Sequence, residues 1–69
     1  MNHRFAENLK NLRLQEGLTQ PQLAEKLGVS KGMISFWENG VYEPTAYHIV
    51  KIAKFFHVTT DELLDFEAT

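Results

Sequence analysis

The sequence of 69 residues contains no cysteine, so neither a disulfide framework nor a thiolate metal site can hold the fold together. It also lacks any apolar run approaching the roughly 18 residues that a membrane-spanning helix requires. No stretch alternates apolar and polar residues over the length of a strand. These absences exclude a disulfide-rich scaffold and a membrane span, and they favour an all-α protein in a single domain (residues 1–69). We expect a cytoplasmic location.

Net charge is low and unevenly distributed. The formal net charge is −2 at pH 7, but residues 1–40 carry five basic and four acidic side chains, whereas residues 41–69 carry two basic and five acidic ones. The acidic excess therefore lies at one end of the chain. Because of this distribution, the net charge does not exclude a nucleic-acid partner.

Apolar residues recur at helical spacing in five short segments, which are separated by helix-start and helix-stop residues. Gly17, Gly28 and the pair Asn39-Gly40 end the first three segments. The residues expected to cap the starts of the later segments are Thr19, Ser30, Thr45 and Thr59. Gln22 follows Thr19 by three positions and Glu62 follows Thr59 by three, so each pair predicts a capping box. The pattern predicts five short helices.

The link between the second and third segments is only Gly28-Val29-Ser30. Such a short link forces two helices to cross steeply and turns the second one outward, which is the geometry of a helix-turn-helix.

The residues around this link resemble the lambda-repressor/Cro-like helix-turn-helix family, also called the xenobiotic-response-element family. The resemblance rests on Leu12-Arg13, Gly17-Leu18-Thr19-Gln20, Leu23-Ala24, Leu27-Gly28-Val29-Ser30, Ile34-Ser35, Trp37-Glu38-Asn39-Gly40, Pro44, Ile49, Ile52-Ala53, Val58 and Asp61-Glu62-Leu63-Leu64. It covers nearly the whole chain. It implies a compact five-helix domain that binds near-palindromic double-stranded DNA, usually as a dimer.

The third segment carries almost no charge on the stripe opposite Ile34 and Trp37. That outward stripe contains Gly32, Ser35, Phe36 and Asn39 at helical spacing. A solvated face normally holds Lys and Glu, so this stripe indicates a contact surface. Lys31 lies in the first helical turn, where the helix dipole disfavours a cation by about 0.3–1 kcal/mol. A phosphate or a guanine edge would favour Lys there; the alternative is a simply solvated Lys31.

The resemblance implies that Lys31, Gly32, Ser35 and Phe36 lie where family members place base-reading residues, and that Gln20, Ser30 and Asn39 lie at phosphate-contacting positions. Two of these residues depart from the family pattern. Phe36 is apolar, and it either packs on thymine methyl groups or folds back onto its own domain. Gly32 has no side chain and can contribute only close backbone approach. Tyr42, in the following loop, can donate its hydroxyl to a phosphate.

Two charged residues lie on otherwise apolar stripes. Arg13 shares a stripe with Phe5 and Leu9, and Glu38 follows Ile34 by four residues. Burying either charge alone is costly, so the sequence predicts an Arg13–Glu38 ion pair between the first and third helices. The resemblance implies the same pair.

Catalysis finds little support in this sequence. The three histidines, at positions 3, 48 and 57, have no metal-ligand spacing. We expect His57 to end the fourth helix and His48 to face solvent. We therefore expect no enzyme activity, no metal and no cofactor.

Three apolar residues, Leu14, Phe55 and Phe66, fall off the inward stripes. Phe55 and Phe66 lie near the C-terminal end, where family members often self-associate, so they are candidates for a homodimer contact. The primary functional prediction is a sequence-specific transcriptional regulator, expected to be a repressor, that reads the major groove with the helix starting at Lys31. The alternative is a protein-interaction module on the same fold, such as an antitoxin, whose binding would use the acidic C-terminal part.

Overall fold

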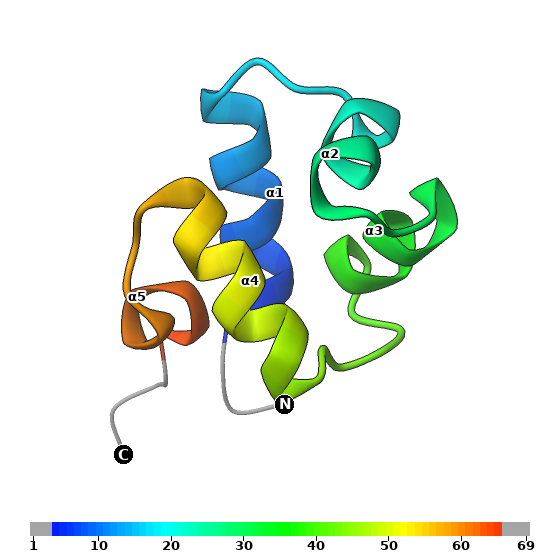
Figure 1. Ribbon diagram of the computed structural model, residues 1–69. Coiled ribbons are helices and arrows are strands. Elements are labelled where there is room, and N and C mark those ends of the chain that lie inside the picture. Colours follow the sequence, from blue (N-terminus) through cyan, green and yellow to red (C-terminus); the bar gives the residue numbers. More distant parts are fainter. Residues whose placement is uncertain (1–3, 66–69) are drawn as a thin grey trace.

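The computed structural model describes residues 4–65, which form five α-helices and no strand (Figure 1). The helices are α1 (Phe5–Gln15), α2 (Gln20–Leu27), α3 (Lys31–Glu38), α4 (Ala46–Phe56) and α5 (Thr60–Leu64). The predicted all-α, five-helix architecture is confirmed. Within residues 4–65, every helix falls short of the length and apolar character that a membrane span needs.

All five helices contribute to one apolar core. Its centre includes the edge-to-face contact of Phe5 in α1 with Trp37 in α3, whose ring centroids lie 6.1 Å apart. The buried apolar residues are Phe5, Leu9, Leu23, Ala24, Leu27, Ile34, Trp37, Ile52, Ala53, Phe56 and Leu63. Complete burial of one large side chain of this kind contributes about 1.5–3 kcal/mol. The core therefore fixes the position of α3 against α1.

The predicted helix starts are confirmed. Thr19 and Thr59 each form a capping box with the residue three positions on. The Ser30 hydroxyl accepts a hydrogen bond from the Met33 N–H at 3.1 Å, and Thr45 caps α4 in the same way. Each cap satisfies a backbone donor that the first helical turn leaves unpaired.

The corner between α2 and α3 is set by the backbone of Gly28, whose φ is +71°. The N–H of Gly28 donates to the Glu25 carbonyl at 3.3 Å, and the N–H of Val29 donates to the Ala24 carbonyl at 3.0 Å. This is a Schellman motif, which needs a left-handed residue at the helix end. Since Ser30 starts α3 two residues later, the chain turns sharply and leaves α3 on one side of the molecule (Figure 1).

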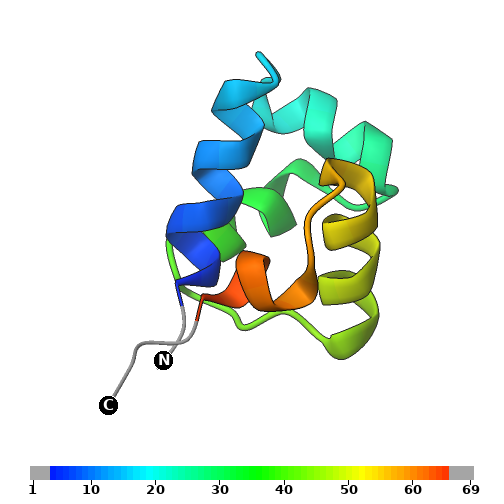
Figure 2. The ribbon, with the colours of Figure 1, turned by 90° about the vertical axis from the view of Figure 1, so that its left-hand side faces the viewer.

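The start of α1 and the end of α5 lie side by side (Figure 2). The Arg4 N–H donates to the Leu64 carbonyl at 2.6 Å, and the Asn8 side-chain amide donates to the Leu63 carbonyl at 2.9 Å. These bonds attach the short α5 to the body of the domain, away from α3.

Two side chains lie elsewhere than predicted. His48 does not face solvent: it is half-buried between Trp37 and Tyr47, with ring-centroid distances of 5.1 and 5.2 Å. Phe55 is also half-buried, packed against Phe56 and the core, so it offers less surface to a dimer partner than expected. Phe66 lies outside the described residues. His57 does end α4, as predicted, with a left-handed backbone.

Candidate nucleic-acid interface

The outward surface of α3 is accessible along its length. Lys31, Gly32 and Phe36 are exposed and Ser35 is half-buried, whereas Ile34 and Trp37 lie in the core. The exposed fraction of Phe36 is 42%, so the ring is not sealed inside the domain. The only other charge on α3, Glu38, is paired inside the protein. Lys31 is therefore the exposed charge of this helix.

Polar groups on this surface are held by local hydrogen bonds. The Asn39 side-chain amide donates to the Ser35 hydroxyl at 3.3 Å. The Ser30 hydroxyl caps α3 and keeps its own hydrogen available as a donor. The N-terminus of α3 adds backbone N–H groups and a positive dipole end, both of which favour a nearby anion.

Beneath this surface, Arg13 and Glu38 form the ion pair that the sequence predicts. The Arg13 Nε donates to Glu38 Oε2 at 2.6 Å, and its Nη2 donates to Glu38 Oε1 at 2.9 Å. The Nη1 atom donates to the Leu18 carbonyl at 2.9 Å. The arrangement is a bidentate pair with additional hydrogen bonding, the geometry in which a buried pair is best satisfied.

The hydrogen bond to Glu38 raises the pKa of the Arg13 guanidinium above its ordinary value, despite the opposing effect of burial. No buried side-chain nitrogen or oxygen within residues 4–65 lacks a hydrogen-bond partner. Loss of either partner would leave an uncompensated buried charge between α1 and α3.

A third member of this network, Gln20, was not predicted from the sequence. Its side-chain Nε2 donates to Glu38 Oε1 at 3.2 Å, so the start of α2 is tied to the end of α3. The signal was present, because Gln20 lies three and seven residues before Leu23 and Leu27 and therefore on their inward stripe. The network directs the Gln20 side chain toward α3, and one of its two amide hydrogens is used inside the protein.

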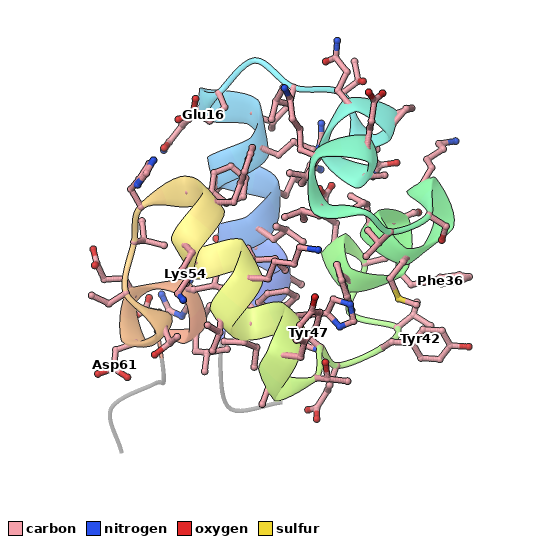
Figure 3. The ribbon with its side chains drawn as sticks, viewed as in Figure 1. Glu16, Phe36, Tyr42, Tyr47, Lys54 and Asp61 are labelled. Carbon is pink, nitrogen blue, oxygen red and sulfur yellow. The ribbon has the colours of Figure 1, made fainter. Side chains whose placement is uncertain are left out.

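Phe36 and Tyr42 form an aromatic pair at the end of α3. Their ring centroids lie 5.1 Å apart with the planes at 73°. Figure 3 shows both rings projecting from the same side of the molecule. The sequence left open whether Phe36 folds back; in the structure it packs against Tyr42 while more than a third of it stays exposed.

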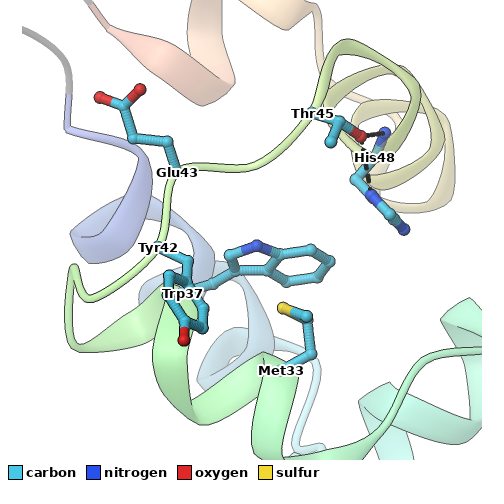
Figure 4. Close-up of a pocket in the computed structure, with 6 residues that line it drawn as sticks. All are labelled: Met33, Trp37, Tyr42, Glu43, Thr45 and His48. Carbon is cyan, nitrogen blue, oxygen red and sulfur yellow. Dashed lines mark hydrogen bonds between the residues drawn. The ribbon is translucent and has the colours of Figure 1, made fainter.

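A hollow of about 260 Å³ lies behind this pair, lined by Met33, Trp37, Tyr42, Glu43, Thr45 and His48 (Figure 4). It is smaller than the typical range of small-molecule sites, about 300–1,000 Å³. His48 Nδ1 and the Thr45 hydroxyl lie 2.8 Å apart at its edge. Within the described part of the chain, no three His, Asp or Glu side chains are grouped to hold a metal ion.

Known proteins are similar to this chain in sequence and in fold. The HTH-type transcriptional activator BcrR of Enterococcus faecalis is 51% identical over 63 residues, which cover 91% of this chain and 31% of BcrR. The crystal structure of a transcriptional regulator from Listeria innocua matches with a TM-score of 0.89 at 32% identity, covering 100% of this chain and 64% of that one. The P22 c2 repressor, solved in complex with a synthetic operator, matches with a TM-score of 0.83 at 27% identity, covering 91% of this chain and 96% of the repressor chain.

The matched region is only part of some of these relatives. The chain spans less than a third of BcrR, so the likeness concerns one domain of that activator. A family model described as helix-turn-helix (HTH_3) matches residues 9–63, which include α2 and α3 in full. Together with the five-helix fold and the corner at Gly28, this match confirms the resemblance drawn from the sequence: the chain belongs to the HTH_3 helix-turn-helix family.

Proposed function

We propose that this protein is a sequence-specific, double-stranded DNA-binding transcriptional regulator that places α3 in the major groove. The observation that carries the proposal is the outward surface of α3, which is accessible and bears Lys31 in its first turn as its exposed charge. An α-helix fits the major groove, which is about 12 Å wide. The P22 c2 repressor, which shares this fold, was solved in complex with a synthetic operator, and this supports double-stranded DNA as the partner.

Base reading is assigned to the α3 surface. Lys31 is suited to the O6 and N7 acceptors of guanine, and the Ser35 hydroxyl can donate to or accept from a base edge. Gly32 has no side chain, so its backbone can approach the groove closely. A Cβ there would meet only the Ser30 hydroxyl oxygen, at 3.8 Å, so packing inside the domain does not require glycine. Phe36 is suited to the apolar methyl group of thymine.

Phosphate contacts are assigned to four residues around this surface: Gln20, Ser30, Asn39 and Tyr42. Gln20 has one side-chain amide hydrogen left and a backbone N–H in the first turn of α2. The Ser30 hydroxyl, the Asn39 amide and the Tyr42 hydroxyl add neutral donors. Neutral donors fix the register of a protein on DNA without neutralising phosphate charge.

We further propose a homodimer on a near-palindromic operator, with repression through occupation of the promoter. In this arrangement the two α3 helices enter successive major grooves about 34–36 Å apart. The contact uses α4 and α5, where Tyr47 and Val50 expose 67% and 43% of their surface and add to the half-buried Phe55. Light scattering tests the dimer: a free protein of 8.0 kDa, together with a complex that holds a single protomer on each operator duplex, would contradict it.

The second candidate function is a protein-interaction module, such as an antitoxin. The exposed side chains of Asp61 and Asp65, at the two ends of α5, favour it because they offer an acidic surface to a basic partner. In either function we expect a cytoplasmic protein without enzyme activity.

A salt titration of DNA binding distinguishes the two candidates. The wild type and a Lys31→Ala/Ser35→Ala variant are compared on a sequence selected from a random pool and on random DNA. Loss of the preference for the selected sequence, with retained weak binding to random DNA, supports the regulator. Equal binding by both proteins to both DNAs contradicts it and favours the interaction module.

A further inference from the structure

The aromatic pair at the end of α3 is organised by the backbone as well as by ring packing. Gly40 has a φ of +71°, and it ends α3 in a second Schellman motif. The N–H of Gly40 donates to the Trp37 carbonyl at 3.2 Å, and the N–H of Val41 donates to the Phe36 carbonyl at 2.9 Å. The chain therefore turns back toward Phe36 directly before Tyr42.

As a result, Phe36 is held at two points. Its carbonyl accepts the hydrogen bond from Val41, and its ring meets that of Tyr42 edge to face. Tyr42 itself lines one side of the hollow that Met33 and Trp37 also line. Contact with Tyr42 restricts the rotamers of Phe36, whose remaining exposed surface projects outward next to Tyr42 (Figure 3).

An exposed and restrained phenyl ring on a groove-reading helix has one suitable partner. The base edges in the major groove present hydrogen-bond donors and acceptors, and their apolar feature is the methyl group on C5 of thymine. Cytosine and uracil lack that methyl group, whereas 5-methylcytosine carries it at the same position. A phenyl ring that contacts this position would therefore distinguish pyrimidines by whether C5 carries a methyl group.

We propose that Phe36 and Tyr42 form a binding site for the C5-methyl group of a pyrimidine, in which Phe36 contacts the methyl group and Tyr42 is a positioning residue. The inference rests on the proposed function, since it requires α3 in the major groove. It goes beyond that function by giving Tyr42 a positioning role and by predicting that the site accepts thymine and 5-methylcytosine alike.

The experiment uses a DNA sequence selected by the wild-type protein and replaces its thymines with uracil one at a time, which removes the methyl group alone. At one thymine in each half-site we expect affinity to fall about fourfold, the value for one buried methyl group. Replacing that thymine–adenine pair with 5-methylcytosine–guanine should cost less affinity than replacing it with cytosine–guanine.

Three variants assign the effect to residues. Phe36→Ala should bind the thymine and uracil operators equally. Tyr42→Phe keeps the ring contact and should keep the wild-type ratio of the two affinities, even if overall affinity falls through the lost hydroxyl. Tyr42→Leu should lower that ratio toward one. If Phe36→Ala does not fold, Phe36→Leu takes its place. We expect this variant to show a smaller ratio of thymine-operator to uracil-operator affinity than the wild type.

The outcomes separate this inference from the proposed function. If a sequence is selected but no thymine-to-uracil change weakens wild-type binding, the methyl site is overturned and the regulator stands. If Tyr42→Leu keeps the full wild-type ratio, the positioning role of Tyr42 is overturned. If no sequence is selected at all, the proposed function itself fails, and this inference fails with it.

Discussion

At the scale of single residues, the Arg13–Glu38 pair shows how a charge on an apolar stripe becomes a structural element. The two side chains are almost fully buried, with 10% and 3% of their surface exposed. We expect Glu38→Ala to lower the free energy of unfolding by about 3–5 kcal/mol, because it leaves the Arg13 guanidinium buried and unpaired. Urea denaturation measures this, with the exposed Glu25→Ala as the matched control. Equal stability of the two variants would show that the pair contributes nothing.

Lys31, by contrast, is exposed and lies at a position where the helix dipole is unfavourable for a positive charge. The dipole of α3 disfavours a cation in the first turn, so we expect Lys31→Ala to raise the free energy of unfolding by about 0.3–1 kcal/mol. The same change should weaken operator binding and, if Lys31 contacts a phosphate, lower the salt dependence by about one unit of slope. Lys54→Ala, in the last turn of α4, is the control and should do neither. Unchanged DNA affinity in Lys31→Ala would remove Lys31 from the interface.

At the scale of helices, we expect alanine substitutions at two glycines to change the stability of the domain in opposite directions, because the two backbones have different conformations. Gly28 ends α2 with a positive φ, so Gly28→Ala should destabilise the domain by about 1–2 kcal/mol through left-handed strain. Gly32 lies inside α3 with helical backbone and open space, so Gly32→Ala should stabilise the domain by about 0.5–1 kcal/mol. Thermal unfolding of both variants measures the difference. Destabilisation by Gly32→Ala would mean that the start of α3 is packed more tightly than the structure shows.

The capping box of α5 predicts a dependence on pH. Hydrogen bonds from Thr59 hold the pKa of the Glu62 carboxyl below its usual value. A group with a lowered folded-state pKa adds stability above its unfolded-state pKa, and that stability is lost as the pH falls through the folded-state value. Thr59→Ala/Glu62→Gln should therefore show a smaller loss of stability than the wild type as the pH falls below 4.5, the ordinary pKa of a glutamate carboxyl. Thermal melts across that range measure it; parallel curves for the two proteins would contradict the assignment.

For the molecule as a whole, local signals in the sequence were sufficient to predict the order of the five helices and the sharp turn between α2 and α3. The caps at Thr19, Ser30 and Thr59 and the turn at Gly28 depend on neighbouring residues, so the helix order and the corner could be predicted. The Arg13–Glu38 pair could be predicted because each charge interrupts an apolar stripe. The resemblance to the family added the positions that we propose to face DNA.

Features that depend on how helices meet could not be predicted in the same way. Gln20 joins the ion pair only because α2 starts beside the end of α3. His48 is half-buried because the loop after α3 brings α4 against Trp37, a contact that the polarity of His48 does not indicate. The Phe36–Tyr42 pair requires the backbone to turn back at Gly40, and a stop signal alone does not specify where the following side chain points.

The proposed function requires α3 to face the DNA. The most direct test is to follow the backbone amide signals of the labelled protein by NMR while a selected operator duplex is added. We predict that the largest shift changes fall on residues 30–36 and at Gln20, Asn39 and Tyr42, with smaller changes in α1. Changes concentrated on α4 and α5, with the α3 amides unaffected, would contradict the account.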